Sequence, residues 1–489
     1  MKHLRKFKTK ADWDAYMQQT PIPVYPYVYY IEDSRETEYS GLEVDIPLYI
    51  ENITGTSVKF SNNYEYSRDG ETWQSGTSST VISFTESGER VYFRASGLTA
   101  SSSSGIGSFS STAGEFNIGG NIMSMVYGAD YRGKTELTQT YTFYRMFYQL
   151  TRLKSARFLA LPATTLTSYC YNAMFYSCTS LVNAPALPAT TLASYCYRSM
   201  FYGCTSLVNA PAILPATTLT TYCYSDMFYN CKALVNAPAL PATTLASYCY
   251  RQMFYNCTSL VNAPALPATT VTRACYCYMF RGCTSLVNAP ALPATTIADE
   301  DPSGQEAGCY YGMFYGCTSL VNAPAILPAT TLVGSCYGYM FRGCTSLVNA
   351  PALPAMSLSA SNYGSNYDGC YNSMFYGCTS LVNAPALPAT TLVHSCYRYM
   401  FYGCTSLKTA PVLPAKSLQN NCYAYMFYGC TNLSYIKAMF TNTPSTTYTE
   451  SWVKDVASTG QFVKNSAATW NVTGVNGIPE GWTVETADA

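Results

Sequence analysis

Carboxylates and imidazoles, the side chains that most often carry hydrolytic chemistry, are scarce along most of this chain. Between residues 170 and 440 there is one histidine, His394, and the acidic residues are Asp226, Asp299, Glu300, Asp301, Glu306 and Asp368. Glycoside hydrolysis needs two facing carboxyl groups roughly 5 to 9.5 Å apart. Most of these acids belong to a single inserted loop, ADEDPSGQEAG. We therefore expect no enzyme, and a polysaccharide depolymerase is only a third hypothesis.

The same acidic loop supplies the one metal hypothesis that the sequence offers with clustered oxygens. Asp299, Glu300, Asp301 and Glu306 carry carboxylates, which calcium prefers as ligands. The loop lacks the ligand spacing of an EF-hand, and a solvated acidic loop is the alternative interpretation. We expect no cofactor.

All 21 cysteines lie between Cys170 and Cys430, and ten pairs are separated by eight residues, as Cys170 and Cys178 are. If the intervening segment is helical, eight residues span roughly 12 Å, too far for a disulfide within a pair. Zinc is the alternative, but there is no CxxC motif, and the one close pair, Cys275 and Cys277, has no neighbouring histidine. We expect free, buried thiols.

No other catalytic arrangement is recognisable. His3 and His394 have no serine or cysteine partner at a known spacing, since Cys396 occupies a repeated core position. No glycine-rich phosphate-binding motif is present. Nucleophilic and nucleotide-dependent chemistry are therefore not expected.

A repeat of mostly 26 or 27 residues organises the middle of the chain and must position whatever function it has. Its unit reads TSLVNAPALPATTLASYCYRSMFYGC, as at residues 179–204. The aligned Met-Phe dipeptides begin at Met146, Met174, Met200, Met227, Met253, Met279, Met313, Met340, Met374, Met400 and Met426.

Each unit predicts one coil of a solenoid. LVNAPAL is short, apolar and bounded by proline, which favours a brief strand. On the other side, Cys196, Met200, Phe201 and Cys204 recur at helical spacing and form an apolar face that only neighbouring coils can bury. We expect about eleven coils with an α+β architecture, roughly 50 Å long.

These repeats resemble the BspA-like leucine-rich repeats of gut bacterial surface proteins. The run from Phe201 to Leu207, FYGCTSL, matches that family closely and recurs along about 300 residues. The resemblance implies a leucine-rich-type solenoid over residues 135–440. The longer unit and the second cysteine depart from the family pattern.

Flanking segments lack the repeat. Residues 42–134 predict a sandwich-like all-β domain and connector, with Asp69-Gly70 as a hairpin turn. Glycan binding there through Tyr64, Tyr66 or Trp73 is weighed against simple packing. Residues 441–489 are expected to cap the last coil, because an open edge invites aggregation.

Residues 1–41 combine a basic arm, a short helix candidate (ADWDAYMQQ) and a Tyr/Pro-rich extended piece. The opening KHLRKFKTKADWDAYMQQ, with YIEDSRETEY after it, resembles the N-terminal segment of virion proteins of phages that infect gut Bacteroidales. That resemblance implies a docking arm that binds other virion proteins. No apolar run of a secretory signal follows the basic residues, which fits assembly in a host cytoplasm.

The amino-acid composition restricts the classes of partner that we expect this chain to bind. Only 11% of the residues are charged, 46 are tyrosine, and the formal net charge is zero. A neutral chain argues against nucleic acid or an anionic membrane as the main partner, and a neutral glycan fits better. No apolar stretch approaches the roughly 18 residues that span a bilayer.

The candidate binding residues are those that change from coil to coil. The two positions before each methionine vary, and they include Arg198, Arg251, Arg398 and Tyr399. Neutral drift at solvent positions would give the same pattern. A second inserted loop, SLSASNYGSNYDGC, has the composition of adaptable recognition loops. Its candidates are Tyr363, Asn366 and Tyr367.

From the sequence we expect a phage virion appendage of the tail or head fibre type. Its N-terminus would attach to the particle, and its solenoid would meet a glycan or protein on the host surface. The alternative is a bacterial surface adhesin with BspA-like repeats. Homo-oligomers are compatible with either hypothesis.

Overall fold

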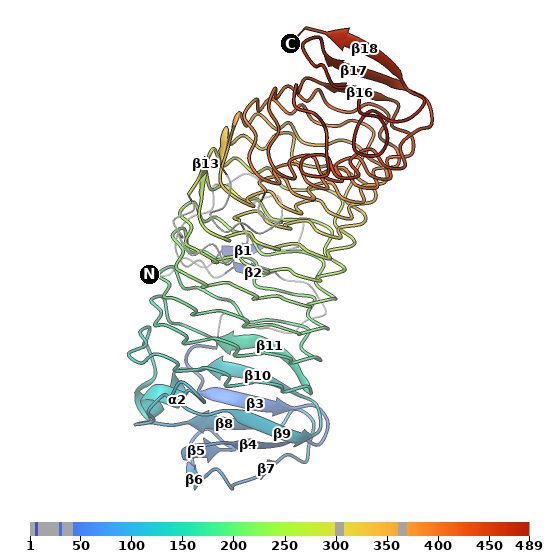
Figure 1. Cartoon of the computed structure of the whole chain (residues 1–489). Coiled ribbons are helices and arrows are strands. Elements are labelled where there is room, and N and C mark those ends of the chain that lie inside the picture. The colour runs from blue at the N-terminus through green and yellow to red at the C-terminus, as the bar shows by residue number, and fades with distance from the viewer. Residues whose placement is uncertain (1–4, 8–28, 32–42, 299–307, 360–368, 489) are drawn as a thin grey trace.

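The computed structural model describes residues 5–7, 29–31, 43–298, 308–359 and 369–488. Figure 1 shows residues 43–488 as an elongated, gently bent stack of coils with β-sheets at both ends. The two short strands β1 (Arg5–Phe7) and β2 (Tyr29–Ile31) pair in parallel. The helix expected at ADWDAYMQQ lies outside the described residues.

One side of every coil is a ribbon of consecutive turns, which we call the turn ribbon: Ser194–Cys204 and its equivalents. Alternate amides donate to the next coil, as Tyr197 does to the carbonyl of Cys223 (3.0 Å) and Phe201 to that of Met227 (2.9 Å). The amides between them close turns within the coil, as Met200 does to the Tyr197 carbonyl (3.2 Å). Every Met-Phe dipeptide of the alignment lies on this ribbon.

The helix expected on this side is wrong. An α-helix would send each amide to the carbonyl four residues earlier, whereas half of these amides bond to the next coil. In addition, φ is positive at every fourth residue, at Tyr195 (61°), Ser199 (55°) and Gly203 (71°). Over a short segment, a period of four is hard to distinguish from the helical 3.6. In the described part of residues 135–440 the structure has no helix.

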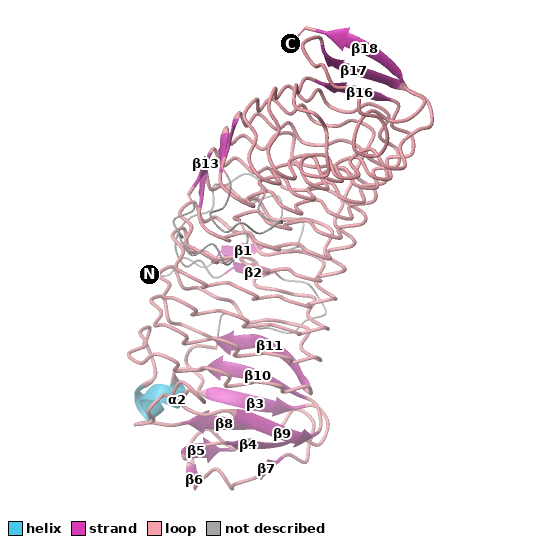
Figure 2. Cartoon of the chain, viewed as in Figure 1, coloured by secondary structure: helices cyan, strands magenta, loops and turns pink. Residues whose placement is uncertain are grey.

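The strand expected at LVNAPAL is present only as isolated β-bridges, such as Asn183 to Asn209 and Asn236 to Asn262. Two prolines follow each asparagine, as Pro185 and Pro188 follow Asn183, and they lack the amides that a longer ladder needs. Bridges and two-residue strands also form at the Thr-Thr-Leu segments, and Figure 2 shows the coils as mostly loop. These short strands are β12 (Thr270–Val271), β13 (Thr296–Ile297), β14 (Thr331–Leu332) and β15 (Ser357–Leu358).

Identical side chains stack along the interior of the solenoid. Cys196, Met200, Phe201 and Cys204 are all 0% exposed, which confirms the apolar ladder. Tyr197 joins it, with its ring 5.5 Å and 5.8 Å from the rings of the equivalent tyrosines in the two neighbouring coils. All 21 cysteines are free and buried, as expected. The expected distance between the two cysteines of a pair assumed a helix, which is wrong. The thiols pack against neighbouring coils, and this keeps them buried.

The segment after residue 42 is built of two sheets. The larger has the strand order β11-β10-β3-β8-β5-β6, and the smaller has the order β7-β4-β9. The expected turn at Asp69-Gly70 joins β5 to β6, with Gly70 at φ 80°. The strands are β3 (Leu48–Asn52), β4 (Ser57–Phe60), β5 (Tyr64–Ser67), β6 (Gln74–Gly76), β7 (Ile82–Ser83), β8 (Arg90–Arg94), β9 (Phe109–Ala113), β10 (Phe116–Asn121) and β11 (Leu153–Ala160). A short helix, α2 (Ser124–Tyr127), and a 3-10 turn, η1 (Gly128–Asp130), follow β10.

These sheets pack directly on the first coil. Strand β11 belongs to that coil and pairs in parallel with β10. The Phe109 ring stacks on Phe147 at 5.5 Å, and the Phe109 amide donates to the carbonyl of Met146 (2.8 Å). The sheets and the coils therefore share one hydrophobic core, and the open edge of the first coil is covered.

Ribbon geometry continues beyond residue 440 although the repeat sequence does not. The amide of Phe427 donates to the carbonyl of Trp452 (2.8 Å), and Trp452 is fully buried among Tyr423, Phe427 and Phe440. Three parallel strands end the chain: β16 (Tyr435–Ala438), β17 (Gln461–Asn465) and β18 (Thr483–Ala487). Large aromatic rings thus close the end of the core.

Truncation of Phe109 tests the shared core. Phe109→Ala should lower the free energy of unfolding by about 3–5 kcal/mol, because it opens a cavity where sheet and coil meet. Hydrogen exchange should accelerate in β9 and in residues 141–149 together, and the effect should fade along the stack. Val412→Ala, at a side chain 49% exposed, is the matched control and should change stability by less than about 0.5 kcal/mol. Faster exchange in β9 alone would contradict a shared core.

A glycine exchange tests the turn ribbon. Ser199 has φ 55°, a conformation that costs non-glycine residues energy. Ser199→Gly should therefore raise the free energy of unfolding by roughly 0.5 kcal/mol. Ser194→Gly, at a position without positive φ, should lower it by a similar amount. Equal losses at both positions, measured by denaturant titration, would argue against the ribbon.

Candidate binding face

The variable residues before each methionine lie on the solvent side of the turn ribbon but are only half-exposed at most. Arg198, Arg251, Arg398 and Tyr399 are half-buried, whereas the equivalent Asp226 is buried. The outer face is therefore a packed surface of side chains lying along the ribbon, and its members contact one another from coil to coil.

Arg198 shows how these contacts run. Its Nε lies 3.5 Å from Oδ2 of Asp226 in the next coil, and its guanidinium lies 5.7 Å and 5.6 Å from the ring centroids of Tyr195 and Tyr222. Asp226 also accepts a hydrogen bond from the Ser225 hydroxyl (2.9 Å). The one acidic group on this part of the ribbon is thus already paired.

Near the other end of the stack, Arg398 and Tyr399 make a similar surface. The Arg398 guanidinium lies 4.9 Å from the ring of Tyr399, which stacks on Tyr425 at 4.7 Å. The structure therefore brings these two predicted residues together. Arg198 and Arg251 lie two coils apart on the same face.

A row of tyrosines missed by the sequence reasoning runs along the same ribbon, and we call it the tyrosine ladder. Its members follow each Met-Phe dipeptide, and neighbouring rings are nearly parallel with centroids 4.4–5.1 Å apart. Its residues are Tyr148, Tyr176, Tyr202, Tyr229, Tyr255, Tyr315, Tyr376, Tyr402 and Tyr428. The repeated FYGC motif was the signal that could have revealed it.

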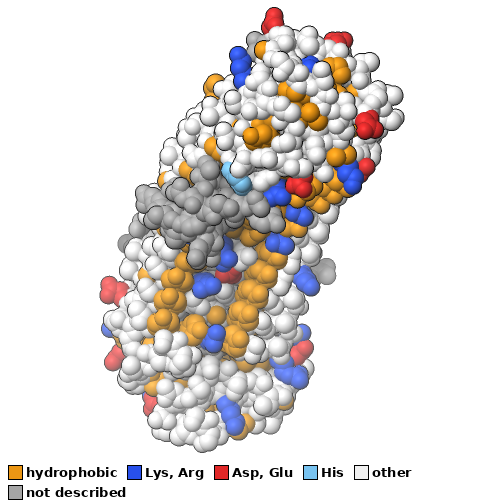
Figure 3. All heavy atoms as spheres, in the orientation of Figure 1, with side chains coloured by type: hydrophobic (Ala, Val, Ile, Leu, Met, Phe, Trp, Pro, Cys, Tyr) orange, Lys and Arg blue, Asp and Glu red, His pale blue; other side chains and the backbone are white. Residues whose placement is uncertain are grey.

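Arginine replaces tyrosine at two rungs of this ladder. The Arg281 guanidinium lies 5.2 Å from the Tyr255 ring and 4.3 Å from the Tyr315 ring. Arg342 likewise lies between Tyr315 (5.5 Å) and Tyr376 (4.1 Å). Each cation continues the stack because the face of an aromatic ring attracts positive charge. Figure 3 shows one face of the molecule, on which hydrophobic side chains form rows that run along the stack.

Charge is unevenly distributed, although the chain as a whole is neutral. Between residues 137 and 449 there are 14 Lys and Arg residues against six Asp and Glu residues. Five of those six acids, Asp299, Glu300, Asp301, Glu306 and Asp368, lie outside the described residues. The acids that balance the total lie mainly toward the two ends of the chain.

The aromatic residues weighed as a glycan site in the all-β segment have structural partners. Tyr64 is buried against Phe60 and Phe93. The Tyr66 hydroxyl hydrogen-bonds Gln74 (2.7 Å), and the Arg94 guanidinium covers the Trp73 ring at 4.0 Å. Packing therefore accounts for these residues.

Seven further candidate residues come from the two inserted loops. The calcium candidates Asp299, Glu300, Asp301 and Glu306 and the loop candidates Tyr363, Asn366 and Tyr367 lie outside the described residues. Within the described ranges no cluster of three or more His, Cys, Asp or Glu side chains could hold a metal ion, and no helix has the length and apolarity to cross a bilayer.

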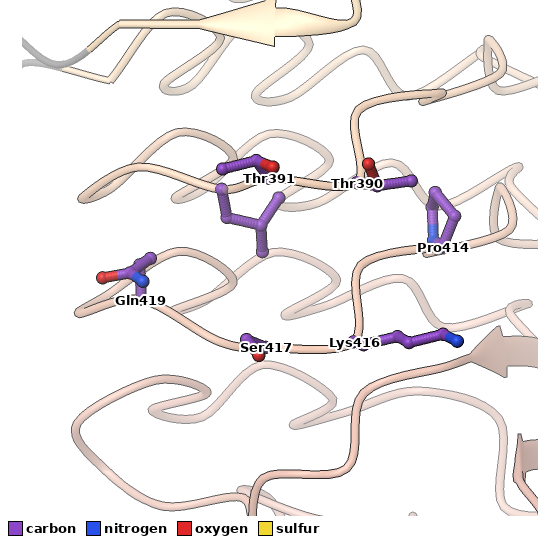
Figure 4. Close-up of a pocket in the computed structure, with 7 residues that line it drawn as sticks. Thr390, Thr391, Pro414, Lys416, Ser417 and Gln419 are labelled. Atoms are coloured by element: carbon purple, nitrogen blue, oxygen red, sulfur yellow. The ribbon is translucent and has the colours of Figure 1, made fainter.

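One hollow of about 510 Å³ opens between neighbouring coils near the C-terminal end. Figure 4 shows Thr390 and Thr391 on one coil facing Pro414, Lys416, Ser417 and Gln419 on the next. No carboxylate or histidine lines it, and none of the predicted binding residues does. Its lining offers no acid–base pair for hydrolysis.

The buried thiols are chemically quiet. Burial raises the pKa of Cys170 and of Cys223 from 9.0 to about 12. Burial likewise holds the pKa of Cys396, the residue near His394, well above its usual value. A thiol that stays protonated is a poor nucleophile and a poor metal ligand.

These raised pKa values predict unfolding in alkali. The unfolded chain loses thiol protons above pH 9 while the folded chain keeps them to about pH 12, so stability is constant below pH 9 and falls as pH rises from there. Each such thiol contributes about 1.4 kcal/mol per pH unit. In reducing buffer, the melting temperature followed by circular dichroism should match at pH 7 and pH 8 and drop steeply by pH 11. An unchanged value at pH 11 would contradict the burial of the thiols.

Comparison with known proteins agrees with the repeat architecture. The family model described as the BspA type leucine rich repeat region matches residues 139–261, 195–298 and 355–453, together more than half of the chain. No curated protein matches. The match begins at residue 139, and the resemblance of residues 1–41 to phage virion proteins stays a prediction.

Two solved structures are similar to the chain. A leucine-rich repeat protein from Bacteroides ovatus is 16% identical, with 70% of this chain and 86% of that chain covered at a TM-score of 0.34. A leucine rich cell surface protein from Faecalibacterium prausnitzii is also 16% identical, with 66% and 90% covered at a TM-score of 0.30. The extent of the family match decides the classification: this chain belongs to the BspA type leucine rich repeat family.

Proposed function

We propose that this protein is a non-catalytic surface adhesin, displayed on a bacterial cell, whose turn ribbon binds a ligand along its length. The observation that carries the proposal is the outer face of the ribbon, where a constant backbone presents changing Arg, Tyr, Ser and Gln side chains from coil to coil. A solenoid of this kind offers an extended surface and no enclosed site. The resemblance of the repeats to those of bacterial surface proteins supports the location.

Arginine and tyrosine suit such a role. Both are enriched at the energetic centres of interfaces, because they combine contact area with directional hydrogen bonds. On this ribbon their positions are fixed by ring stacking, so little side-chain freedom remains to be lost on binding. The solenoid therefore presents a surface already arranged for contact.

A second candidate is the phage virion appendage, favoured by the opening sequence KHLRKFKTKADWDAYMQQ. In that case residues 1–41 bind other virion proteins, and the solenoid meets the host surface. The ribbon would work in the same way in both settings. The two candidates differ in whether a bacterial cell or a phage particle displays the protein.

Immunogold labelling distinguishes the two carriers. Antibody against the solenoid should label the outer surface of intact cells that express the protein, and phage particles purified from the same culture should stay unlabelled. Label on the particles would instead establish the virion appendage. A signal confined to the cell interior would refute surface display of either kind.

Substitution on the ribbon tests binding against neutral drift. The variant Arg251→Ala/Arg398→Ala/Tyr399→Ala should lose about 2 kcal/mol or more of binding to whichever members of a surface-glycan and protein array capture the wild-type chain. The control Lys232→Ala/Lys408→Ala/Val382→Ala changes exposed side chains away from the ribbon and should bind as wild type. Equal binding by all three chains would show that the variation is drift. Release of new reducing ends from captured polysaccharide would overturn the non-catalytic assignment.

A further inference from the structure

Seven valines form an exposed apolar row along the solenoid, outside the turn ribbon, and we call it the valine row. Each follows the leucine of an LVNAPA segment, and neighbouring members are hydrogen-bonded through the backbone, as the Val261 amide is to the Val235 carbonyl (3.2 Å). Its members are Val208, Val235, Val261, Val287, Val321, Val348 and Val382, each 36–44% exposed. They make up half of the fourteen large hydrophobic side chains that are exposed in the described parts of the chain, so the apolar surface is concentrated in one strip.

The residues beside the valines add no charge to this strip. Every VNAPA segment of the row is uncharged, and an exposed alanine lies four residues after each valine, as Ala265 and Ala291 do. The exposed asparagines next to the valines hydrogen-bond along the stack, as Nδ2 of Asn322 does to Oδ1 of Asn288 (2.7 Å). Covering amides that already have a partner costs less than covering free ones. The strip can therefore lose its water at low cost.

Lysine replaces valine at both ends of the row. Lys154 holds the equivalent position in the first coil, where its carbonyl accepts from the Val182 amide (2.8 Å) and its ammonium group pairs with Glu115 (2.8 Å). Lys408 is exposed and holds that position in the coil after Val382, within TSLKTAP in place of TSLVNAP. Charge at the margin of an apolar strip opposes burial there. The valine row therefore has a fixed length.

The strip is large enough for a specific interface of modest size. Seven coils about 4.8 Å apart, with their side chains, give a length of roughly 35 Å, and the four residues from valine to alanine give a width of roughly 15 Å. One copy therefore offers about 500 Å², and a pair would bury about 1,000 Å², near the lower limit for a specific interface. Such an area predicts a weak pair that depends on protein concentration.

We propose that the valine row is an interface between two copies of this chain, with the row of each copy packed against that of the other. A second copy carries valines at the same coil spacing over the same number of coils, whereas a partner without repeats could match only part of the row. Valine and alanine side chains offer no hydrogen bonds to a glycan. The lysines fix the register, since a copy shifted along the stack would bury Lys408 on its partner's apolar strip. Such a pair is closed and does not grow into a filament.

Sedimentation equilibrium of the full chain in reducing buffer tests the pairing. The average mass should rise from that of one chain toward that of two between about 1 and 100 µM. Val261→Lys/Val287→Lys/Val321→Lys brings lysines of both copies together at the centre and should weaken pairing at least about hundredfold. Val261→Thr/Val287→Thr/Val321→Thr keeps the side-chain shape without adding charge. It should weaken pairing at least about tenfold, because buried methyl groups become hydroxyls without partners.

The matched control is Thr269→Lys/Thr295→Lys/Thr330→Lys, which places the same three charges on exposed residues of the same coils. This variant should pair as the wild type does. Melting temperatures at low protein concentration should agree among all variants, because every substituted side chain is exposed. Since none of the substitutions lies on the turn ribbon, the single copies should still bind whatever array ligands the wild type binds.

The outcomes separate pairing from ligand binding by the ribbon. A wild-type chain that stays a single copy over the whole range would overturn the pairing and leave the adhesin proposal standing. A pair that both valine variants leave intact would overturn it as well, because another surface would then form the interface. Binding of a single-copy wild type to phosphatidylcholine vesicles, lost in the lysine variant of the row but not in the control, would assign the row to a lipid surface instead.

Discussion

Backbone amides that alternate between their own coil and the next one are the constraint on which this molecule depends. An isolated turn ribbon cannot satisfy its own backbone amides as a helix does, because half of these amides donate to carbonyls of another coil. Single coils therefore cannot fold alone, and the alternation fixes the stacking distance. That distance in turn places each Cys, Tyr, Met and Phe on its equivalent in the neighbouring coil. Equivalent core side chains stack in rows because the backbone hydrogen bonds hold neighbouring coils in the same register.

The first and last coils of such a stack each have a neighbouring coil on one side only. An open coil would leave amides, carbonyls and aromatic faces uncovered. At the start, two sheets supply Phe109 and the strand β10 to cover the first coil, so the all-β segment is continuous with the solenoid. At the other end, the ribbon continues without its consensus sequence until Trp452 and Trp470 close the aromatic stack. Large rings replace the missing next coil.

The same stacking that builds the core also organises the surface. Tyrosines repeated once per coil form a ladder outside as well as inside, and arginines that replace them are held between rings. The resulting face is a stack of rings and guanidinium groups that continues from coil to coil. A surface that repeats from coil to coil is compatible with the proposed binding of an extended ligand.

The sequence by itself determined the repeat and the buried residues, because a period of mostly 26 or 27 residues carries a Met-Phe-x-x-Cys run in every coil but the first. The family was predicted from the resemblance of these repeats to known ones. The sequence also identified the hairpin at Asp69-Gly70. Only the tertiary structure decided that Cys196 to Cys204 form turns and not a helix, since periods of four and 3.6 coincide over so short a run, and the choice depends on carbonyls some 26 residues away. Only the structure, too, showed that Tyr64 is packing and that arginines two coils apart share one face. Those relations are set by stacking, which no single unit of the sequence contains.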